Sequence, residues 1–261
     1  MPGDTIYLFS DAHLGAPFPD AGRWETQCID FLRSLHGRAS ALYILGDLFD
    51  FWIEYRHCIR ADYFRIVHEL RNLVDSGIPV HYFAGNHDFA FGPFITQTLG
   101  ITVYPGHFET ELQGRRVHLY HGDGLLRLDV GYRLLRRILR NRVNQTLYKL
   151  LPPPLGIGLA SFCSATSRRS REHTMTESML AEYRSHAKEY LDKGNDIVFF
   201  AHTHKAELSR WTGKTYCNTG AWMRDYTYAT MTEGNVRLWR YGEGGAEELP
   251  ASGANAGSSA S

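Results

Sequence analysis

Short apolar runs alternate with amphipathic stretches in the first hundred residues, and this alternation predicts strands and helices in turn. The apolar runs are residues 5–10, 42–45 and 80–84. Between them, residues 25–36 and 62–76 repeat apolar side chains every three or four positions and stop at Gly37 and Gly77, which is typical of helices. Strands that alternate with helices in this way predict an α/β layered fold.

The later part of the chain continues with strands and one capped helix. Residues 94–99 predict a short helix, and a turn at Gln113-Gly114 joins two runs into a hairpin. Thr174-Met-Thr-Glu177 resembles a capping box that opens a helix closing at Gly194. The remaining predicted strands are 109–112, 116–120, 197–201, 216–222, 227–232 and 236–241.

Residues 125–173 have a different character and predict a helical lid inserted over the active site. Leucines and isoleucines between 134 and 151 form one apolar helical face beside a cluster of arginines, until Pro152-Pro-Pro154 breaks the helix. A small, partly apolar piece at 157–162 then leads into the basic run 167–171. The catalytic domain is therefore expected to comprise 1–124 and 174–241, and the Gly-, Ala- and Ser-rich residues 242–261 a disordered tail.

Composition limits the class of protein. With 261 residues, 43% hydrophobic residues and a net charge of zero, the chain is expected to be globular, and nucleic acid is not an expected partner. The four widely spaced cysteines are expected to be free thiols in a reducing compartment. Neither a signal peptide nor an apolar run of about 20 residues is apparent, so a cytoplasmic location is expected.

Side chains that can bind metals directly follow five of the predicted strands. They are Asp11 and His13, Asp47, Asn86 with His87 and Asp88, His121, and His202 with His204. One Asp-x-His or His-x-His pair is a weak indication, but five such groups favour a shared site over scattered surface and core histidines. Imidazoles mixed with carboxylates suit Mn, Fe, Co or Zn, and there are enough ligands for two ions that share a carboxylate. Two such ions form the usual clamp for phosphoester hydrolysis.

The motifs Asp11-x-His13, Gly46-Asp47, Gly85-Asn86-His87-Asp88, His121-Gly122 and His202-x-His204 resemble, in order, those of the calcineurin-like metallophosphoesterases. The resemblance implies a four-layer αββα sandwich with a dinuclear site, manganese being the preferred metal. It also implies that His87 acts as an acid or charge stabiliser oriented by Asp88. The family pattern assigns Asp11, His13, Asp47 and His204 to one ion and Asp47, Asn86, His121 and His202 to the other.

One branch is more similar, the UDP-2,3-diacylglucosamine pyrophosphohydrolases of lipid A biosynthesis. The likeness includes residues 42–53, Leu-Tyr-Ile-Leu-Gly-Asp-Leu-Phe-Asp-Phe-Trp-Ile, His121-Gly-Asp123 and a helical lid. The best-known members of the branch have arginine where this chain has His87. The resemblance implies hydrolysis at the α-phosphorus to UMP and 2,3-diacylglucosamine 1-phosphate. It also implies substrate contacts from Asn86, His87, Asp129, Tyr132, Ser167, Arg168 and Arg171.

The lid offers independent physical support, because acyl chains and a nucleotide diphosphate require an apolar groove beside cationic groups. The same surface could rest on the anionic cytoplasmic face of the inner membrane. No obligate protein partner is expected.

Two alternatives stay open: a phosphodiesterase or nucleotide pyrophosphatase acting on a soluble substrate, and a non-catalytic scaffold built on a phosphoesterase domain. Hydrolysis of UDP-sugars without acyl chains at the same rate as the acylated substrate would favour the first. Lost ligands would favour the second, but the chain retains the full set.

Overall fold

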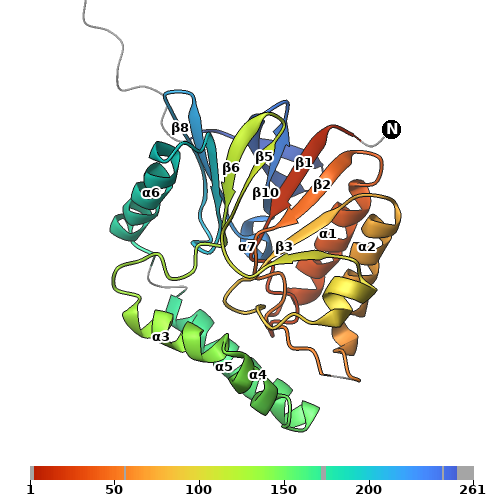
Figure 1. Cartoon of the computed structure of the whole chain (residues 1–261). Coiled ribbons are helices and arrows are strands. Elements are labelled where there is room, and N and C mark those ends of the chain that lie inside the picture. Colours follow the sequence, from red (N-terminus) through yellow and green to blue (C-terminus); the bar gives the residue numbers. More distant parts are fainter. Residues whose placement is uncertain (1–2, 56, 172–174, 243, 252–261) are drawn as a thin grey trace, which may run out of the picture.

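Two stacked β-sheets with helices on both outer faces form the body of the protein in the computed structural model, which describes residues 3–55, 57–171, 175–242 and 244–251 (Figure 1). The seven-stranded sheet has the order β12-β11-β10-β1-β2-β3-β4, and the five-stranded sheet has the order β5-β6-β7-β9-β8. The first sheet contains β1 (Thr5–Phe9), β2 (Ala39–Ile44), β3 (Val80–Phe83), β4 (Thr102–Tyr104), β10 (Thr227–Thr232), β11 (Asn235–Gly242) and β12 (Gly245–Leu249). The second contains β5 (Phe108–Leu112), β6 (Arg115–Leu119), β7 (Ile197–Phe200), β8 (Ala206–Trp211) and β9 (Lys214–Thr219).

Successive side chains of a strand pack on opposite faces of its sheet, and this alternation builds the layers of the sandwich. In β1, Tyr7 and Phe9 join the apolar cluster shared with the helices, whereas Leu8 joins the cluster between the two sheets. In β7, Phe199 faces the other sheet and Phe200 packs in the cluster that includes α6. Because successive side chains of a strand point to opposite faces, both faces of these strands are buried.

Three helices cover the outer faces of the sheets. The helices α1 (Ala21–Ser34) and α2 (Phe64–Asp75) pack on the first sheet, with the 3₁₀ turn η1 (Ala61–Tyr63) directly before α2. The helix α6 (Glu177–Asp192) packs on the second sheet through Tyr183, Ala187 and Leu191. The predicted αββα sandwich is therefore confirmed.

The helices α3 (Val130–Leu139), α4 (Arg142–Tyr148) and α5 (Pro153–Arg171) lie together below the sheets in Figure 1. The prediction that the proline run separates a helix from a small apolar piece was incomplete, since α5 begins at Pro153 and continues to Arg171. Proline is well tolerated at the first position of a helix, where its missing N–H has no intrahelical partner. The lid therefore has one long helix where the sequence suggested two short segments.

Other boundaries also differ from the predictions. The strands β4 and β8 were not predicted, and α7 (Trp222–Asp225) replaces the end of the predicted strand 216–222. The tail prediction was wrong for β12, which pairs with β11, while residues 252–261 lie outside the described part. Thr174 also lies outside it, and the side chain of Thr176 caps α6 by accepting from the Met179 amide. The predicted short helix near 94–99 is present as η2 (Phe94–Thr98), a π-helical turn.

Among the described residues, no helix has both the length and the apolar character required to cross a bilayer. Cys28, Cys58, Cys163 and Cys217 are free thiols, as the sequence predicted.

Candidate metal centre

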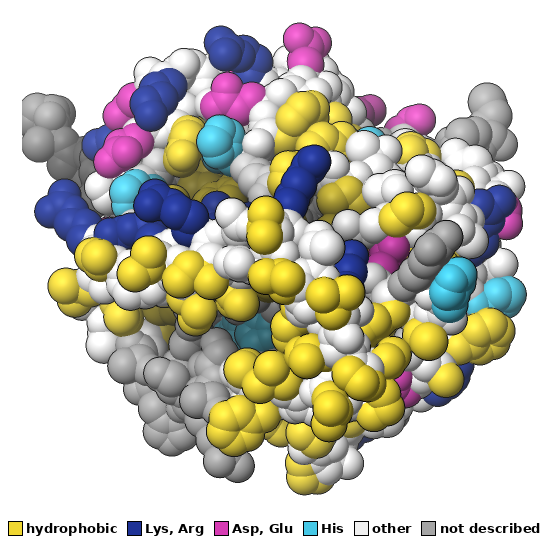
Figure 2. All heavy atoms as spheres, turned by 60° about the horizontal axis from the view of Figure 1, so that its bottom comes forward, with side chains coloured by type: hydrophobic (Ala, Val, Ile, Leu, Met, Phe, Trp, Pro, Cys, Tyr) yellow, Lys and Arg dark blue, Asp and Glu magenta, His cyan; other side chains and the backbone are white. Residues whose placement is uncertain are grey.

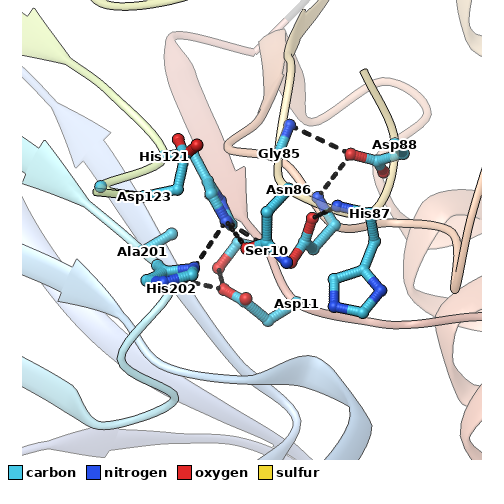
Figure 3. A network of polar contacts seen from close by, with 12 residues as sticks. Ser10, Asp11, Gly85, Asn86, His87, Asp88, His121, Asp123, Ala201 and His202 are labelled. Carbon is cyan, nitrogen blue, oxygen red and sulfur yellow. Dashed lines mark hydrogen bonds and ion pairs between the residues drawn. The ribbon is translucent and has the colours of Figure 1, made fainter. Parts of the chain in front are cut away.

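The predicted ligands meet because they follow strands that run in parallel. The strands β1, β2 and β3 are parallel neighbours, as are β6 and β7 in the other sheet. In parallel sheets the carboxyl ends of the strands share one edge, and ligands bind at that edge. Figure 3 shows Asp11, Asn86, His121 and His202 converging from separate loops.

Asp11, His13 and His204 form the first group of side chains that could hold an ion. The Oδ1 atom of Asp11 lies 3.2 Å from Nε2 of His204 and 3.9 Å from Nε2 of His13. This oxygen is buried and accepts no hydrogen bond from the described residues. A buried carboxylate oxygen that faces two imidazole nitrogens suits a divalent cation, because a cation would compensate the loss of solvation.

A second group is centred on His121. Its Nε2 lies 3.0 Å from Nδ1 of His202, 3.3 Å from Oδ1 of Asn86 and 3.5 Å from Oδ2 of Asp47. Ligand atoms about 2.0–2.2 Å from a shared ion are roughly 3–3.5 Å apart, so these separations fit one coordination sphere.

Asp47 lies between the two groups. Its Oδ2 is 3.5 Å from Nε2 of His121 and 3.8 Å from Nε2 of His13, while its Oδ1 accepts a hydrogen bond from the His87 amide. Burial alone would raise the pKa of Asp47, but the charges of His121 and His87 hold it well below its ordinary value. Asp47 is therefore an ionised carboxylate that faces both groups of candidate ligands.

The other ring nitrogen of His121 is held by the protein. Nδ1 lies 2.7 Å from the main-chain oxygen of Leu45. Because a carbonyl can only accept, Nδ1 carries the proton, and the lone pair of the neutral ring is on Nε2, toward Asp47, Asn86 and His202. Without a cation, burial would lower the pKa of His121, but the carboxylates, Asp47 above all, raise it to about 10.

Several candidate ligands have backbone conformations that are rare for residues with a side chain. The φ angle is positive at Asp11 (50°), His13 (43°), Asp47 (53°), His202 (68°) and His204 (55°). Each such residue costs of order 1 kcal/mol or more, and strain of this kind concentrates at functional sites. The loops are therefore shaped to aim these side chains at the expense of local stability.

Two glycines permit the close approach of the loops. A Cβ atom on Gly85 would lie 2.0 Å from Oδ1 of Asp47, and one on Gly46 would lie 2.6 Å from Nδ1 of His121. Gly46 also has a φ of +91°. The positions before Asp47 and Asn86 therefore have no room for a side chain, and this explains the glycines in the two motifs.

Asp88 joins the loops that follow β2 and β3. Its carboxylate accepts hydrogen bonds from the main-chain amides of Asp47, Phe49 and Gly85 and from the hydroxyl of Tyr82. Burial, followed by the charge of Asp47, raises the pKa of Asp88 to about 7. These contacts hold the ligand loops together. None of them is with the His87 ring, and the ring-orienting role of Asp88 stays a prediction.

The His87 ring is held from another direction. Its Nδ1 lies 2.8 Å from the main-chain oxygen of Asp50 and 2.9 Å from Oγ of Ser164 on α5. The rings of His87 and His13 meet edge to face at 4.7 Å. His87 thus lies beside the candidate metal centre and also contacts the lid.

The predicted substrate contacts are only partly described. Tyr132 is on α3 and donates a 2.7 Å hydrogen bond to Oδ2 of Asp123, and Asp129 is half-buried at the start of the same helix. Ser167, Arg168 and Arg171 belong to α5, but their side chains lie outside the described part of the chain.

Sequence reasoning missed several polar residues that join the lid to the body. Asp123 is fully buried and forms ion pairs with Arg136 at 3.2 Å and Arg140 at 3.3 Å. The four-residue spacing of the two arginines on one helical face was a usable signal. Ser164 and its contact with His87 carried no signal, because the contact depends on how α5 docks.

A cavity of about 380 Å³ extends from Asn86 and His87 into the lid. Its walls are apolar and come from the loops after β2 and β3 and from all three lid helices. The lining includes Phe51, Trp52, Phe89, Tyr132, Leu135, Ile138, Leu139, Tyr148, Leu159 and Ala160. The cavity can therefore accept an apolar group attached to a molecule bound at the candidate metal centre.

Comparisons with known proteins agree with this geometry. A family model described as "Calcineurin-like phosphoesterase" matches residues 5–206. A protein of Porphyromonas gingivalis named "UDP-2,3-diacylglucosamine hydrolase" is 34% identical over 204 residues, which cover 77% of each chain. Proteins of the same name from Neisseria meningitidis serogroup C and Haemophilus influenzae are 29% and 27% identical, and the matches cover 88% and 84% of this chain and 94% and 91% of theirs.

Proposed function

Because the chain belongs to the calcineurin-like phosphoesterase family and is a metal-dependent hydrolase, we propose that it hydrolyses the pyrophosphate of UDP-2,3-diacylglucosamine. Water attacks the α-phosphorus, the bond from that phosphorus to the bridging oxygen breaks, and the products are UMP and 2,3-diacylglucosamine 1-phosphate. The names of the relatives support this substrate.

The apolar cavity beside Asn86 and His87 is the observation that carries the proposal. A nucleotide diphosphate alone would require a polar site, whereas a diacylated sugar requires apolar surface next to its phosphates. Burial of an acyl chain contributes about 0.8 kcal/mol for each CH₂ group. The cavity therefore favours the acylated substrate over the soluble phosphodiester that the sequence left as an alternative.

We assign two divalent ions to the centre, manganese being the proposed metal. Asp11, His13, Asp47 and His204 would hold one ion, and Asp47, Asn86, His121 and His202 the other, in keeping with the distances between their donor atoms. When bound, such ions polarise the phosphoryl group and lower the pKa of water.

The residues of the chain have separate tasks in this proposal. His87 lies between the centre and the cavity, where its ring would stabilise charge on the leaving phosphate or protonate it. Asn86 would also touch the phosphates. Tyr132, Asp129 and the basic end of α5 would contact the sugar and the nucleotide.

We further propose that the lid rests on the cytoplasmic face of an anionic membrane, from which the substrate is drawn. Figure 2 shows hydrophobic side chains gathered on the face that the lid presents, with lysine and arginine side chains along its margin. Among the described residues of the lid, exposed apolar side chains include Leu128 (89%), Leu150 (76%) and Phe162 (71%). An apolar face with a basic margin is typical of interfacial binding.

Product analysis tests the proposed reaction. Manganese-loaded protein is incubated with UDP-2,3-diacylglucosamine, and the products are identified by mass spectrometry. UMP together with 2,3-diacylglucosamine 1-phosphate is the expected result. Equal rates on UDP-glucosamine without acyl chains would reject the lipid assignment, and no hydrolysis of any phosphoester would reject the enzyme.

A further inference from the structure

Ser164 on α5 is buried in a part of the lid that leaves large apolar side chains in solvent. Its exposure is 6%, whereas Phe162, two residues earlier, is 71% exposed and Leu159 is 48% exposed. Burial normally favours the apolar side chains, and a buried hydroxyl costs free energy unless it has hydrogen-bond partners. The buried Ser164 hydroxyl is therefore expected to have hydrogen-bond partners that compensate its loss of solvation.

The hydroxyl contacts two residues of the catalytic body. Ser164 Oγ lies 2.7 Å from Oδ1 of Asp50, 3.0 Å from the main-chain oxygen of Asp50 and 2.9 Å from Nδ1 of His87. His87 Nδ1 is also 2.8 Å from that main-chain oxygen. Asp50 and His87 are 1% and 9% exposed, so water does not compete effectively for these contacts.

The chemistry of the partners fixes the direction of each hydrogen bond. A carbonyl oxygen only accepts, so Nδ1 of the His87 ring carries a proton, shared by the Asp50 carbonyl and Ser164 Oγ. The Asp50 carboxylate accepts, so the Ser164 hydroxyl donates its own proton to Oδ1. With Nδ1 held in these contacts, Nε2 is the ring nitrogen left to face the phosphates in the proposed function. The acid or charge-stabilising role requires the imidazolium form, which carries a second proton on Nε2, and the hydroxyl from the lid is part of what sets this orientation.

We propose that Ser164 is a positioning residue that acts through His87, so that hydrolysis is efficient only when α5 is docked on the body. The proposal rests on the proposed function, since it gives the lid a share in the reaction besides holding the acyl chains. In the sequence, 77 positions separate the two residues, and α5 is the element that brings them together.

A double-mutant cycle separates this role from simple anchoring of the lid. The values of kcat and KM are measured for wild type, Ser164→Ala, His87→Ala and the double variant, with UDP-2,3-diacylglucosamine and with bis(p-nitrophenyl) phosphate. Ser161→Ala removes a hydroxyl from the same helix and is the control. General acid–base groups contribute about 10²–10⁴-fold, so loss of their orientation is expected to lower kcat about tenfold with little change in KM.

The key expectation is non-additivity. Ser164→Ala lowers kcat in the wild-type background and changes it less than about twofold in the His87→Ala background, because the two side chains act as one unit. An equal loss in both backgrounds, or no loss in the wild type, overturns the proposal. If only bis(p-nitrophenyl) phosphate is hydrolysed, the proposed lipid substrate fails, and the cycle on that phosphodiester still decides the role of Ser164.

An NMR measurement that does not depend on enzymatic activity completes the test. In zinc-loaded, diamagnetic protein, the ring Nδ1 resonance of His87 is assigned by its loss in His87→Ala. Removal of one hydrogen-bond acceptor is expected to shift this resonance in Ser164→Ala and not in Ser161→Ala. An unchanged resonance in Ser164→Ala overturns the proposal.

Discussion

Arg140, at the end of lid helix α3, donates a 2.9 Å hydrogen bond from Nη2 to the main-chain oxygen of Gly85, the residue directly before Asn86. The same Nη2 lies 3.3 Å from Oδ2 of Asp123, and Nη1 donates to the main-chain oxygen of Pro105. One side chain therefore links the lid, the loop that carries Asn86 and the fully buried carboxylate of Asp123.

Arg140→Ala is expected to destabilise the protein by about 1–3 kcal/mol, because a buried carboxylate and a carbonyl each lose a donor. Denaturant unfolding measures this change. Arg137→Ala, at an exposed position on the same helix, is the control and is expected to change stability by less than about 0.5 kcal/mol. Equal stabilities of the two variants would contradict the role of Arg140.

Asp47→Asn is expected to reduce bound metal from two ions to at most one, because Asp47 faces both ligand groups. Mutation of a residue that only hydrogen-bonds to a metal ligand typically lowers metal affinity or activity by about 10–100-fold. Because Asp47 faces the ions directly in this proposal, the rate of hydrolysis is expected to fall more than about hundredfold. Elemental analysis and phosphodiester hydrolysis check the two effects. Asp75→Asn, at an exposed ion pair with Arg71, is the control. Two ions retained by Asp47→Asn would rule out a bridging carboxylate.

Metal uptake is expected to release a proton at pH 7. In the metal-free protein the pKa of His121 is raised to about 10, so its ring is protonated at neutral pH and must lose that proton to become a ligand. Apparent affinity should therefore rise with pH, by up to about tenfold per unit, until pH passes this pKa. Calorimetry in buffers with different ionisation enthalpies counts the protons, and a value of zero would contradict a protonated His121 in the metal-free protein.

Ala160→Phe is expected to raise KM for the acylated substrate, because it fills part of the cavity beside His87. At about 0.8 kcal/mol for each CH₂ group, every methylene excluded corresponds to about fourfold. Kinetics with a series of acyl lengths should show the largest loss for the longest chains and little change for bis(p-nitrophenyl) phosphate. Ala181→Phe, exposed on α6, is the control. A loss that is equal for both substrates would mean that the cavity does not hold acyl chains.

Replacement of Leu147 and Leu150 by Asp is expected to weaken binding to vesicles containing phosphatidylglycerol. These leucines are 58% and 76% exposed on the lid, and the change removes apolar area and adds negative charge. Vesicle sedimentation at low and high salt measures the effect. Phe64→Asp alters a similarly exposed apolar residue on α2, outside the lid. Equal binding of all variants would exclude the lid as the membrane-facing surface.

Much of the site follows from sequence because each ligand lies directly after a buried strand. The runs that end before Asp11, Asp47 and His121 are apolar and short, and parallel pairing then brings their ends together. Strands with mixed composition were harder to predict. β8 was missed because Glu207 and Arg210 interrupt its apolar residues, although Glu207 is buried through an ion pair with Arg184.

The sequence pattern was sufficient to predict helices in the lid. It was not sufficient to predict which residues of the lid contact the body. The apolar face between residues 134 and 151 indicated helices, and α3 and α4 confirm them. The contacts of Ser164 with His87 and of Arg140 with Gly85 result from docking between segments more than fifty positions apart. Local patterns do not specify such docking, because its free energy arises from surfaces that meet only in the folded protein.

The left-handed backbone at Asp11, His13, Asp47, His202 and His204 bears on any attempt to engineer this protein. Glycine or asparagine would relieve the conformational cost at each of these five positions. A selection for thermal stability alone would therefore enrich such replacements at these positions. The selected variants would be more stable but would lack the side chains proposed to bind the metal ions. Laboratory evolution of this chain should keep a hydrolysis requirement in every round.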